Sequence, residues 1–303
     1  MNAVITIDGL RKSYGQREAV RGIDLEVHAG EIFAFLGPNG AGKTTTVEIL
    51  EGYRDPTAGQ VWVLGADPAR ADRDWRSRIG VMLQSWQVEP ALTVRESLEQ
   101  FAGYYPRPLP VEEVVRLVGL EEQRDTRAGR LSGGQQRRLD MGIALVGDPE
   151  LLFLDEPTTG FDPAARRGAW QIIASLRDAG KTVMLTTHYL DEAQALADRV
   201  AILVDGRIMT HGPPDSLVAG HPTRITFQLP HGVALPPLPL PGRLDAEAAD
   251  GRVELRSHAP VPLVHALTAW AMENGHDLAD LQVRRPSLED VYLDLTSTPR
   301  AQS

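Results

Sequence analysis

The chain has 303 residues, no cysteine, and 41 acidic against 31 basic side chains, which gives a formal net charge of −10. This length suggests one large domain or two smaller ones. The absence of cysteine excludes a disulfide scaffold, a thiol nucleophile and a thiolate metal site, and the acidic balance argues against nucleic acid as the main partner.

The N-terminal residues predict the opening of a parallel α/β fold. Residues 4–7 and 23–27 alternate apolar and polar side chains, as half-buried strands do. Residues 31–36 are nearly all apolar, which suits a strand covered on both faces. A glycine-rich turn at 37–40 and a helix from about 43 to 51 follow this strand.

The next part of the chain predicts more strands around a helical insertion. Residues 93–146 show a helical pattern that prolines 106, 108 and 110 interrupt, and a helix is also expected over 163–179. Short apolar runs predict strands at 61–64, 79–83, 151–154, 183–186 and 200–204, with 207–210 completing a terminal hairpin. We expect a first domain over 1–220, with its helical subdomain at about 85–150.

The character of the sequence changes near residue 220, where Gly220 and Pro222 mark a break. Beyond it we expect a strand at 252–255, a helix at 261–274, a strand at 281–284 and a last helix. The last helix should begin at a capping box in residues 287–290. We therefore predict a small α+β accessory domain over 222–298 and a flexible tail over 299–303.

Residues 37–44 fit the pattern G-x-x-x-x-G-K-[ST] between a strand and a helix. Glycines allow a tight loop whose backbone N–H groups point at a phosphate, and the positive end of the following helix favours the same anion. In this pattern Lys43 can reach the β- and γ-phosphates, and the hydroxyl of Thr44 can bind Mg²⁺. A chance match is the alternative.

An apolar strand, residues 151–154, ends in two acids, Asp155 and Glu156. A carboxylate at a strand end can hold Mg²⁺, and its neighbour can take a proton from an attacking water. Adjacent strand residues point in opposite directions, so the two acids should have different roles. The alternative is a strand end with two solvated acids.

Residues 131–135 (LSGGQ) open a further helix, with Ser132 as a plausible N-cap. Its two glycines expose consecutive N–H groups, so this helix start is a candidate second anion site. An ordinary capped helix is the alternative.

These motifs together resemble the nucleotide-binding subunit of an ATP-binding cassette (ABC) transporter. Residues 37–44 match the Walker A loop, 131–135 the signature motif and 151–156 the Walker B strand with its catalytic glutamate. Single residues match the A-loop, Q-loop and switch positions of the family, and they are Tyr14, Gln84 and His188. Residues 160–162 match the D-loop, with Phe161 where leucine is usual, which leaves the fine tuning of dimer contacts open.

The resemblance implies a P-loop cassette with a mixed sheet core, ATP and Mg²⁺ as cofactors, and a role for each matching residue. The implied catalytic residues are Glu156, His188 and Lys43. The implied Mg²⁺ contacts are Thr44, Gln84 and Asp155. The implied nucleotide contacts are Tyr14, Gly37, Pro38, Asn39, Gly40, Ala41, Gly42, Lys43, Thr44, Thr45, Gln84, Ser132, Gly133, Gly134 and Gln135. Without the resemblance, Tyr14 and His188 would be interpreted as structural residues, and the amide of Gln84 would have no predicted role.

The resemblance also implies partners. Residues 188–193 and 286–293 resemble daunorubicin-resistance-type exporter ATPases, which commonly serve a separately encoded permease. No apolar run approaches the about 18 residues of a membrane helix, and residues 1–9 lack a secretory signal, so we expect a cytoplasmic chain held on the inner face of the membrane by its permease. We expect residues 84–99 to form part of the permease contact, through Val88, Leu92 and Val94, with core packing as the alternative.

ATP is expected to lie between two copies, or between two paralogous chains, with the loop 37–45 of one facing residues 132–135 of the other. Two other functions remain as alternatives. One is a soluble, non-transport member of the same superfamily that acts on ribosomes or DNA, and the other is a small-molecule P-loop kinase. The sequence does not identify the cargo.

Overall fold

The computed structural model describes residues 2–82, 88–230, 232–233, 245–249 and 251–297. The chain divides into two compact units, Met1–Pro214 and Asp215–Ser303. Among the described residues, the first unit has two sheets and the second has one, and each unit has a core of its own.

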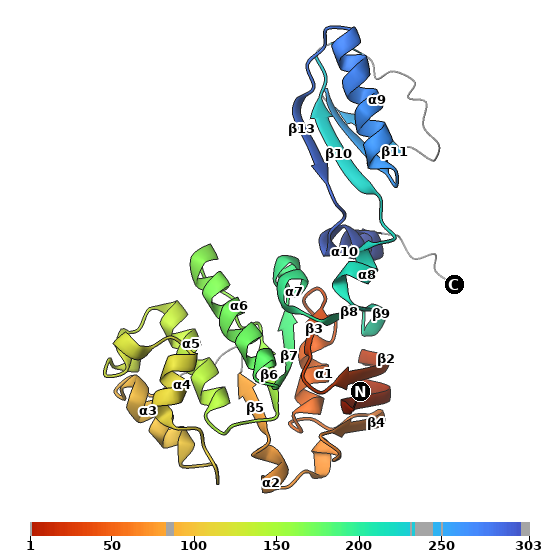
Figure 1. The fold of residues 1–303 in the computed structure, drawn as a ribbon. Helices are drawn as coiled ribbons and strands as arrows, with labels where there is room; N and C mark the ends of the chain where they lie inside the picture. The colour runs from red at the N-terminus through yellow and green to blue at the C-terminus, as the bar shows by residue number, and fades with distance from the viewer. Residues whose placement is uncertain (1, 83–87, 231, 234–244, 250, 298–303) are drawn as a thin grey trace. The chain divides into compact units, whose positions relative to one another are not determined.

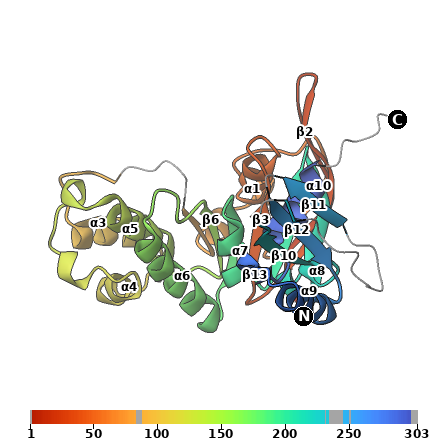
Figure 2. The same cartoon turned by 90° about the horizontal axis from the view of Figure 1, so that it is seen from above.

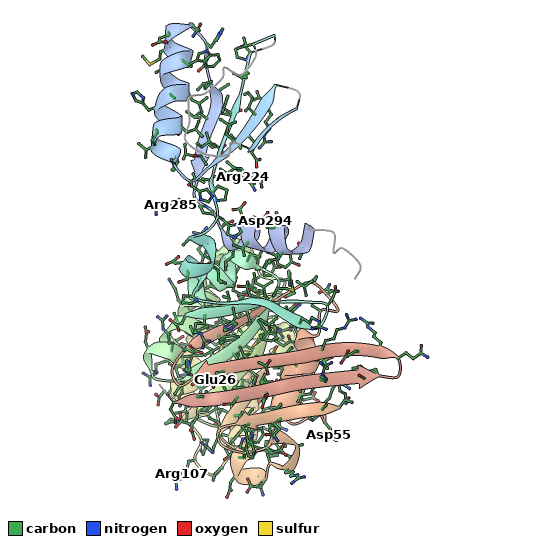
Figure 3. All side chains as sticks on the ribbon, turned by 90° about the vertical axis from the view of Figure 1, so that its right-hand side faces the viewer. Glu26, Asp55, Arg107, Arg224, Arg285 and Asp294 are labelled. Atoms are coloured by element: carbon green, nitrogen blue, oxygen red, sulfur yellow. The ribbon has the colours of Figure 1, made fainter. Side chains whose placement is uncertain are left out.

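The first unit begins with an antiparallel sheet in the order β2-β1-β4, formed by β1 (Ala3–Tyr14), β2 (Arg17–His28) and β4 (Ala58–Val63). Ile5 pairs with Val27 and Ile7 with Leu25, and all four side chains are buried. Both long strands extend well beyond the predicted 4–7 and 23–27, because bulges let backbone pairing continue where the apolar alternation stops. Figure 3 shows these strands running side by side, with Glu26 labelled on β2.

A six-stranded sheet carries the rest of the first unit, in the order β5-β6-β7-β3-β8-β9 (Figure 1). The first five of these strands are parallel and only β9 runs antiparallel. The strands are β3 (Ile32–Leu36), β5 (Ile79–Met82), β6 (Leu151–Asp155), β7 (Thr182–Thr187), β8 (Arg199–Val204) and β9 (Arg207–Gly212). Every residue of β3 is buried, which confirms the prediction of a strand covered on both faces.

Helices cover this sheet and form the insertion. Helices α3 (Val94–Ala102), α4 (Val111–Leu117) and α5 (Gly133–Leu145) pack on one another to one side of the sheets, inside the predicted insertion (Figures 1 and 2). The other helices of this unit are α1 (Lys43–Leu50), α2 (Arg73–Arg76), α6 (Pro163–Asp178) and α7 (Leu190–Leu196), with short 3₁₀ turns at Pro68–Arg70, Glu121–Gln123 and Ala128–Arg130. Among the helices of the described residues, none combines the length and the apolar character that crossing a bilayer requires.

The second unit begins within α8 (Pro214–Val218) and has a four-stranded antiparallel sheet in the order β11-β12-β10-β13. The sheet consists of β10 (Thr223–Gln228), β11 (Asp245–Ala249), β12 (Arg252–Ser257) and β13 (Ala279–Arg284), and it is followed by α10 (Leu288–Ser297). Helix α9 (Pro260–Glu273) packs Leu263 and Leu267 on Ile225 and Phe227. Sequence analysis predicted β12, α9, part of β13 and α10, but it missed β10 and β11.

Polar contacts join the last helix to β10 and to the segment that precedes it. Arg224 donates a hydrogen bond of 2.6 Å to Asp290, and His221 Nδ1 lies 3.1 Å from Asp294 (Figure 3). Half of the predicted capping box is present, because the backbone N–H and the hydroxyl of Ser287 both donate to the carboxylate of Asp290. The N–H of Asp290 instead donates to the backbone carbonyl of Ser287.

Candidate nucleotide site

The predicted phosphate loop, the two acids after β6 and the end of β1 meet at one pocket of about 430 Å³. Its lining residues are Tyr14, Arg17, Ala19, Asn39, Gly40, Gly42, Lys43, Thr44, Thr45, Asp155 and Glu156. Segments that are more than 100 residues apart in the sequence therefore face the same space, because β3 and β6 both end at this edge of the sheet.

The phosphate loop requires glycine at two positions. Gly42 has φ of +102°, and a Cβ built on it would lie 2.5 Å from the carbonyl oxygen of Ala19. A Cβ on Gly37 would lie 2.3 Å from the carbonyl oxygen of Leu203. Any larger residue would push the loop off the sheet, so these glycines fix where the N-terminus of α1 points.

Lys43 is the first residue of α1 and turns its side chain back into the loop. Its Nζ donates to the carbonyl oxygens of Gly37 at 2.6 Å and Pro38 at 3.1 Å, and the residue is only 6% exposed. Burial lowers the pKa of Lys43, while the nearby charges of Glu156 and Asp155 oppose that shift. The loop thus holds the ammonium group at the pocket, where an anion would be its natural counter-charge.

The three threonines that follow Lys43 differ in position. Thr44 and Thr45 line the pocket, whereas Thr46 is fully buried and donates to the carbonyl oxygen of Gly42 at 2.9 Å. The hydroxyl of Thr44 and the carboxylate of Asp155 therefore lie at the same pocket, and they are the hard oxygen ligands that Mg²⁺ prefers. The described residues include no cluster of three or more His, Cys, Asp or Glu side chains that could hold a metal, so an ion here would need phosphate and water oxygens as well.

The two acids after β6 are held in different ways. The hydroxyl of Thr186, on the neighbouring strand β7, donates to Oδ1 of Asp155. Glu156 has φ of +47°, and its N–H donates to the carbonyl oxygen and to the hydroxyl of Thr186, both at 3.1 Å. The left-handed backbone at Glu156 turns its side chain away from the direction that β6 would give it.

The carboxylate of Glu156 contacts His188 and Thr159. Oε1 lies 3.2 Å from Nδ1 of His188, and Oε2 accepts a hydrogen bond of 3.0 Å from the hydroxyl of Thr159. His188 follows β7 directly, and its ring packs on that of Tyr189 at a centroid distance of 4.1 Å. The chain therefore presents an acid and an imidazole side by side at the pocket edge.

Arg137, to which the sequence pattern assigned no role, contacts the backbone of both acids. From α5, its guanidinium donates to the backbone carbonyl oxygens of Asp155 at 2.9 Å and Glu156 at 3.1 Å. A nitrogen of the same group lies 3.8 Å from Asp140. Burial lowers the pKa of Arg137, although Asp140 and the two acids oppose that shift. A basic residue one turn into the signature helix was the only sequence signal.

Sequence analysis also missed Glu192, a fully buried acid on α7. Its Oε1 accepts hydrogen bonds from the hydroxyl of Thr158 at 2.7 Å and from the indole N–H of Trp170 at 3.1 Å. Burial raises the pKa of Glu192. Since Thr158 follows Glu156 by two residues and Glu192 follows His188 by four, this carboxyl ties together the two segments that carry the catalytic candidates.

The signature residues lie elsewhere on the first unit. Ser132 caps α5 in a reciprocal box, where the N–H of Gln135 donates to the hydroxyl of Ser132 at 3.3 Å and the N–H of Ser132 donates to the Gln135 side chain at 2.9 Å. Ser132 and Gly133 are exposed, and neither they nor Gly134 and Gln135 line the phosphate pocket. One copy of the chain does not bring these two motifs together.

The remaining predicted residues differ in how far they are exposed. Tyr14 is 43% exposed, with Lys12 Nζ at 5.4 Å and the Arg54 guanidinium at 5.8 Å from its ring centroid. Gln84 lies outside the described residues. Phe161 is buried, so it packs within the fold. Of the three expected permease contacts, Val94 is fully buried, which makes core packing the right interpretation there, and Val88 and Leu92 are half-buried.

Family models match both units. A model described as "ABC transporter" matches residues 20–159, and a model of the C-terminal domain of ABC transporter domain-containing proteins matches residues 223–287. Daunorubicin resistance ATP-binding protein DrrA2 of Streptomyces coeruleorubidus is 38% identical over 96% of this chain and 94% of its own length. Nod factor export ATP-binding protein I of Ralstonia nicotianae is 37% identical over 97% of this chain and 94% of its own.

Solved structures resemble the first unit. The structure of cbiO1 from Clostridium perfringens, described as part of the ABC transporter complex cbiONQ, has a TM-score of 0.66 and 26% identity over 73% of this chain and 92% of that one. The dimeric structure of MJ0796, a bacterial ABC transporter cassette, has a TM-score of 0.62 and 27% identity over 69% of this chain and 98% of that one.

Proposed function

This chain belongs to the family of ABC transporter ATP-binding subunits, and we propose that it hydrolyses ATP to drive export through a separately encoded membrane permease. The relatives that match nearly its whole length are named for drug resistance and for Nod factor export. Their names favour an amphipathic or drug-like cargo, and they give no support to an action on ribosomes or DNA. The permease would hold the chain at the inner face of the membrane.

The observation that supports this proposal most strongly is that Tyr14, Lys43, Thr44 and Asp155 all line the phosphate pocket. Lys43 at the loop supplies positive charge for the β- and γ-phosphates, and Tyr14, which also lines the pocket, offers a ring on which adenine can stack. Thr44 and Asp155 would hold Mg²⁺, which would neutralise phosphate charge when bound. These four residues suit a nucleoside triphosphate better than a smaller anion.

Water activation falls to Glu156 in this proposal. Phosphoryl transfer to water depends on positioning and charge more than on covalent chemistry. The Glu156 carboxylate would orient the water and accept its proton, while His188, 3.2 Å away, would hold that carboxylate and contact the γ-phosphate. A positioned base of this kind typically contributes about 10²–10⁴-fold to the rate.

The location of the signature residues supports a dimer. Ser132 and Gly133 are exposed at the start of α5 and face no phosphate within their own chain, so a second copy, or a paralogous chain, would supply them. ATP held between the two would stabilise the closed pair, and loss of the γ-phosphate would release it, because a ligand favours the state that binds it better. The second unit, including residues 222–298, would serve this assembly as an accessory domain.

The test uses Glu156→Gln with ATP and Mg²⁺. This variant should bind ATP, hydrolyse it at a rate lower by about 10²–10⁴-fold, and elute as a dimer on size exclusion. Adding Ser132→Arg should return it to a monomer, because the bulky cation would block the exposed helix start. Parental ATPase activity in Glu156→Gln would refute the role of the base, and a monomer in ATP would refute the dimer.

A further inference from the structure

The imidazole of His188 belongs to a small group of stacked side chains beside the phosphate pocket. It packs on the ring of Tyr189 at a centroid distance of 4.1 Å and an interplanar angle of 39°. The guanidinium of Arg166 lies 4.0 Å from the centroid of the same tyrosine ring. We call Arg166, Tyr189 and His188 the stack. One aromatic ring therefore contacts both a cation from α6 and the imidazole beside Glu156.

Tyr189 stands where helix capping does not explain it. It occupies the N-cap position of α7, at which Ser, Thr, Asp or Asn is usual, and its side chain makes no cap hydrogen bond. Its hydroxyl makes no hydrogen bond with any described residue. Its backbone N–H donates to the hydroxyl of the buried Thr187 at 2.9 Å, which fixes the start of the side chain to the end of β7. The contacts of this side chain in the described part of the chain are thus those of its ring.

Helix α6 brings Arg166 to this ring. Arg166 and Trp170 are four residues apart, so they lie on the same face of α6. The indole N–H of Trp170 donates to Glu192 at 3.1 Å, and Arg166 lies 3.5 Å from Asp191, so this face packs on α7. Figures 1 and 2 show the two helices next to each other. The side chain of Arg166, only 20% exposed, is therefore held over Tyr189 by a helix that is tied to α7 at a second point.

His188 depends on this support because little else holds it. It follows β7 outside any helix or strand, and its side chain is 42% exposed. Among the described residues, its imidazole makes ring or ion-pair contacts with Tyr189 and Glu156 alone. An exposed side chain without a packing partner samples several rotamers, and only some of them would direct the ring at the carboxylate.

We propose that Tyr189 is a positioning residue for His188, and that Arg166 holds the tyrosine ring in place for this task. The inference rests on the function proposed above and adds the side chains that aim its imidazole. Aromatic rings attract one another in tilted or offset packing at such distances, and a guanidinium is attracted to the face of a ring. The stack would keep Nδ1 facing Glu156 and leave the exposed part of the imidazole to the γ-phosphate. Ordinary packing between α6 and α7 is the alternative, and it predicts lower stability without a selective loss of turnover.

The first experiment compares Tyr189→Leu with Tyr189→Phe in a steady-state ATPase assay. Leucine keeps apolar bulk but removes the ring, so kcat should fall about five- to tenfold while the ATP affinity stays within about twofold of the parental value. The conservative phenylalanine keeps the ring and should restore the parental kcat. Equal kcat in the leucine and phenylalanine variants would overturn the proposal.

The second experiment asks whether the loss passes through the imidazole. Adding Tyr189→Leu to His188→Ala should lower kcat no further than His188→Ala does alone, because the ring then has nothing to position. A second loss of the same size as in the parental background would show that Tyr189 acts on the fold instead, and it would overturn the proposal.

The third experiment tests the contribution of Arg166. Arg166→Ala should lower kcat about two- to fivefold, since it acts on the imidazole only through the tyrosine. The matched control is Arg167→Ala, which removes the neighbouring exposed arginine of α6. Asp191→Asn removes the charge of the ion pair but keeps the stack, and it should turn over like the parental chain because an exposed pair contributes little. A parental kcat in Arg166→Ala would overturn the role given to Arg166.

A measurement by NMR reads the stack without relying on turnover. The imidazole signals of His188, one of eight histidines, are identified by their absence in His188→Ala. They should carry a ring-current shift in the parental chain and in Tyr189→Phe, and lose it in Tyr189→Leu. Identical shifts in all three would overturn the proposal. A parental chain that hydrolysed no ATP would instead refute the proposed function, while the stacking itself would still be measured.

Discussion

Nδ1 of His188 lies 3.2 Å from Oε1 of Glu156, so the imidazole that follows β7 and the carboxylate that follows β6 face each other as a close pair at the pocket edge. The two residues arrive from neighbouring parallel strands, and the carboxylate is further held by the hydroxyl of Thr159. This geometry makes the two side chains a single functional unit in the proposed reaction.

The first prediction concerns that unit. Glu156→Gln and His188→Ala should each lower kcat, the former by about 10²–10⁴-fold, and the double variant should be little worse than Glu156→Gln alone. The reason is that a histidine which acts by holding the carboxylate has nothing to hold once the base is gone. Steady-state ATPase rates of the four proteins form the cycle, and losses that multiply would show that the two residues act independently.

The second prediction concerns Lys43. Lys43→Ala should weaken ATP binding by about 10–100-fold, because a charge-assisted contact to phosphate is worth roughly 1.5–3 kcal/mol. Titration calorimetry measures the affinity directly. The control is Lys181→Ala, a lysine that pairs with Asp148 and does not line the phosphate pocket. Equal ATP affinity in Lys43→Ala and the parental chain would contradict the phosphate contact.

The third prediction concerns the buried acid of α7. Glu192→Ala should lower the free energy of unfolding by about 2–4 kcal/mol, because the Thr158 hydroxyl and the Trp170 indole lose their acceptor and a cavity remains. Glu192→Gln keeps an oxygen for both donors and should restore most of that stability near neutral pH. Urea denaturation measures the three proteins.

The same acid predicts a pH effect. Since burial raises the folded-state pKa of Glu192 above its unfolded value, the folded state binds more protons. The stability that protonation contributes is complete below the unfolded pKa and is lost as the pH rises through the folded one. Glu192→Gln cannot ionise and should therefore gain on the parental chain as the pH rises. A gap between them that stays constant with pH would exclude this account.

The fourth prediction concerns Glu51, the buried acid that follows α1. The pKa of Glu51 is raised from 4.5 to about 8, so the parental chain should lose stability as the pH rises across that window. At about 1.4 kcal/mol per pKa unit, the upper limit of the loss is roughly 4–5 kcal/mol. Glu51→Gln should match the parental chain near pH 5 and exceed it above pH 8, as measured by thermal unfolding. Glu99→Gln, an exposed acid, should follow the parental curve.

The phosphate loop and the two acids could be predicted from the sequence because their chemistry requires adjacent residues. Two short patterns contain these residues. Residues 37–44 hold the glycines that let the loop close and Lys43 at the helix start, and residues 151–156 end in Asp155 and Glu156. The all-apolar strand β3 could also be predicted from the sequence, because a strand that is buried on both faces contains no polar residue.

Other parts of the molecule depend on contacts that no local pattern records. Arg137 and Glu192 look like ordinary helix residues, and only the folded chain brings them to Glu156 and Thr158. Strand β10 has the sequence TRITFQ, which alternates apolar and polar residues, so it was missed although its pattern is present. Strand β11 has the sequence DAEAA, whose only apolar residues are alanines, and its pairing with β12 is what defines it. The sequence predicted Ser132 as a helix N-cap, but it did not show that this cap lies away from the phosphate pocket of the same chain.

The guanidinium of Arg137 has a consequence for regulation. A single side chain from the signature helix holds the carbonyl groups on which the direction of Glu156 depends. A rotation of the helical segment would therefore move these carbonyl groups, and with them the carboxylate that we propose activates water. A subunit without its permease could keep ATP bound without hydrolysing it. Hydrolysis would then begin only when a permease with bound cargo sets the helix in place.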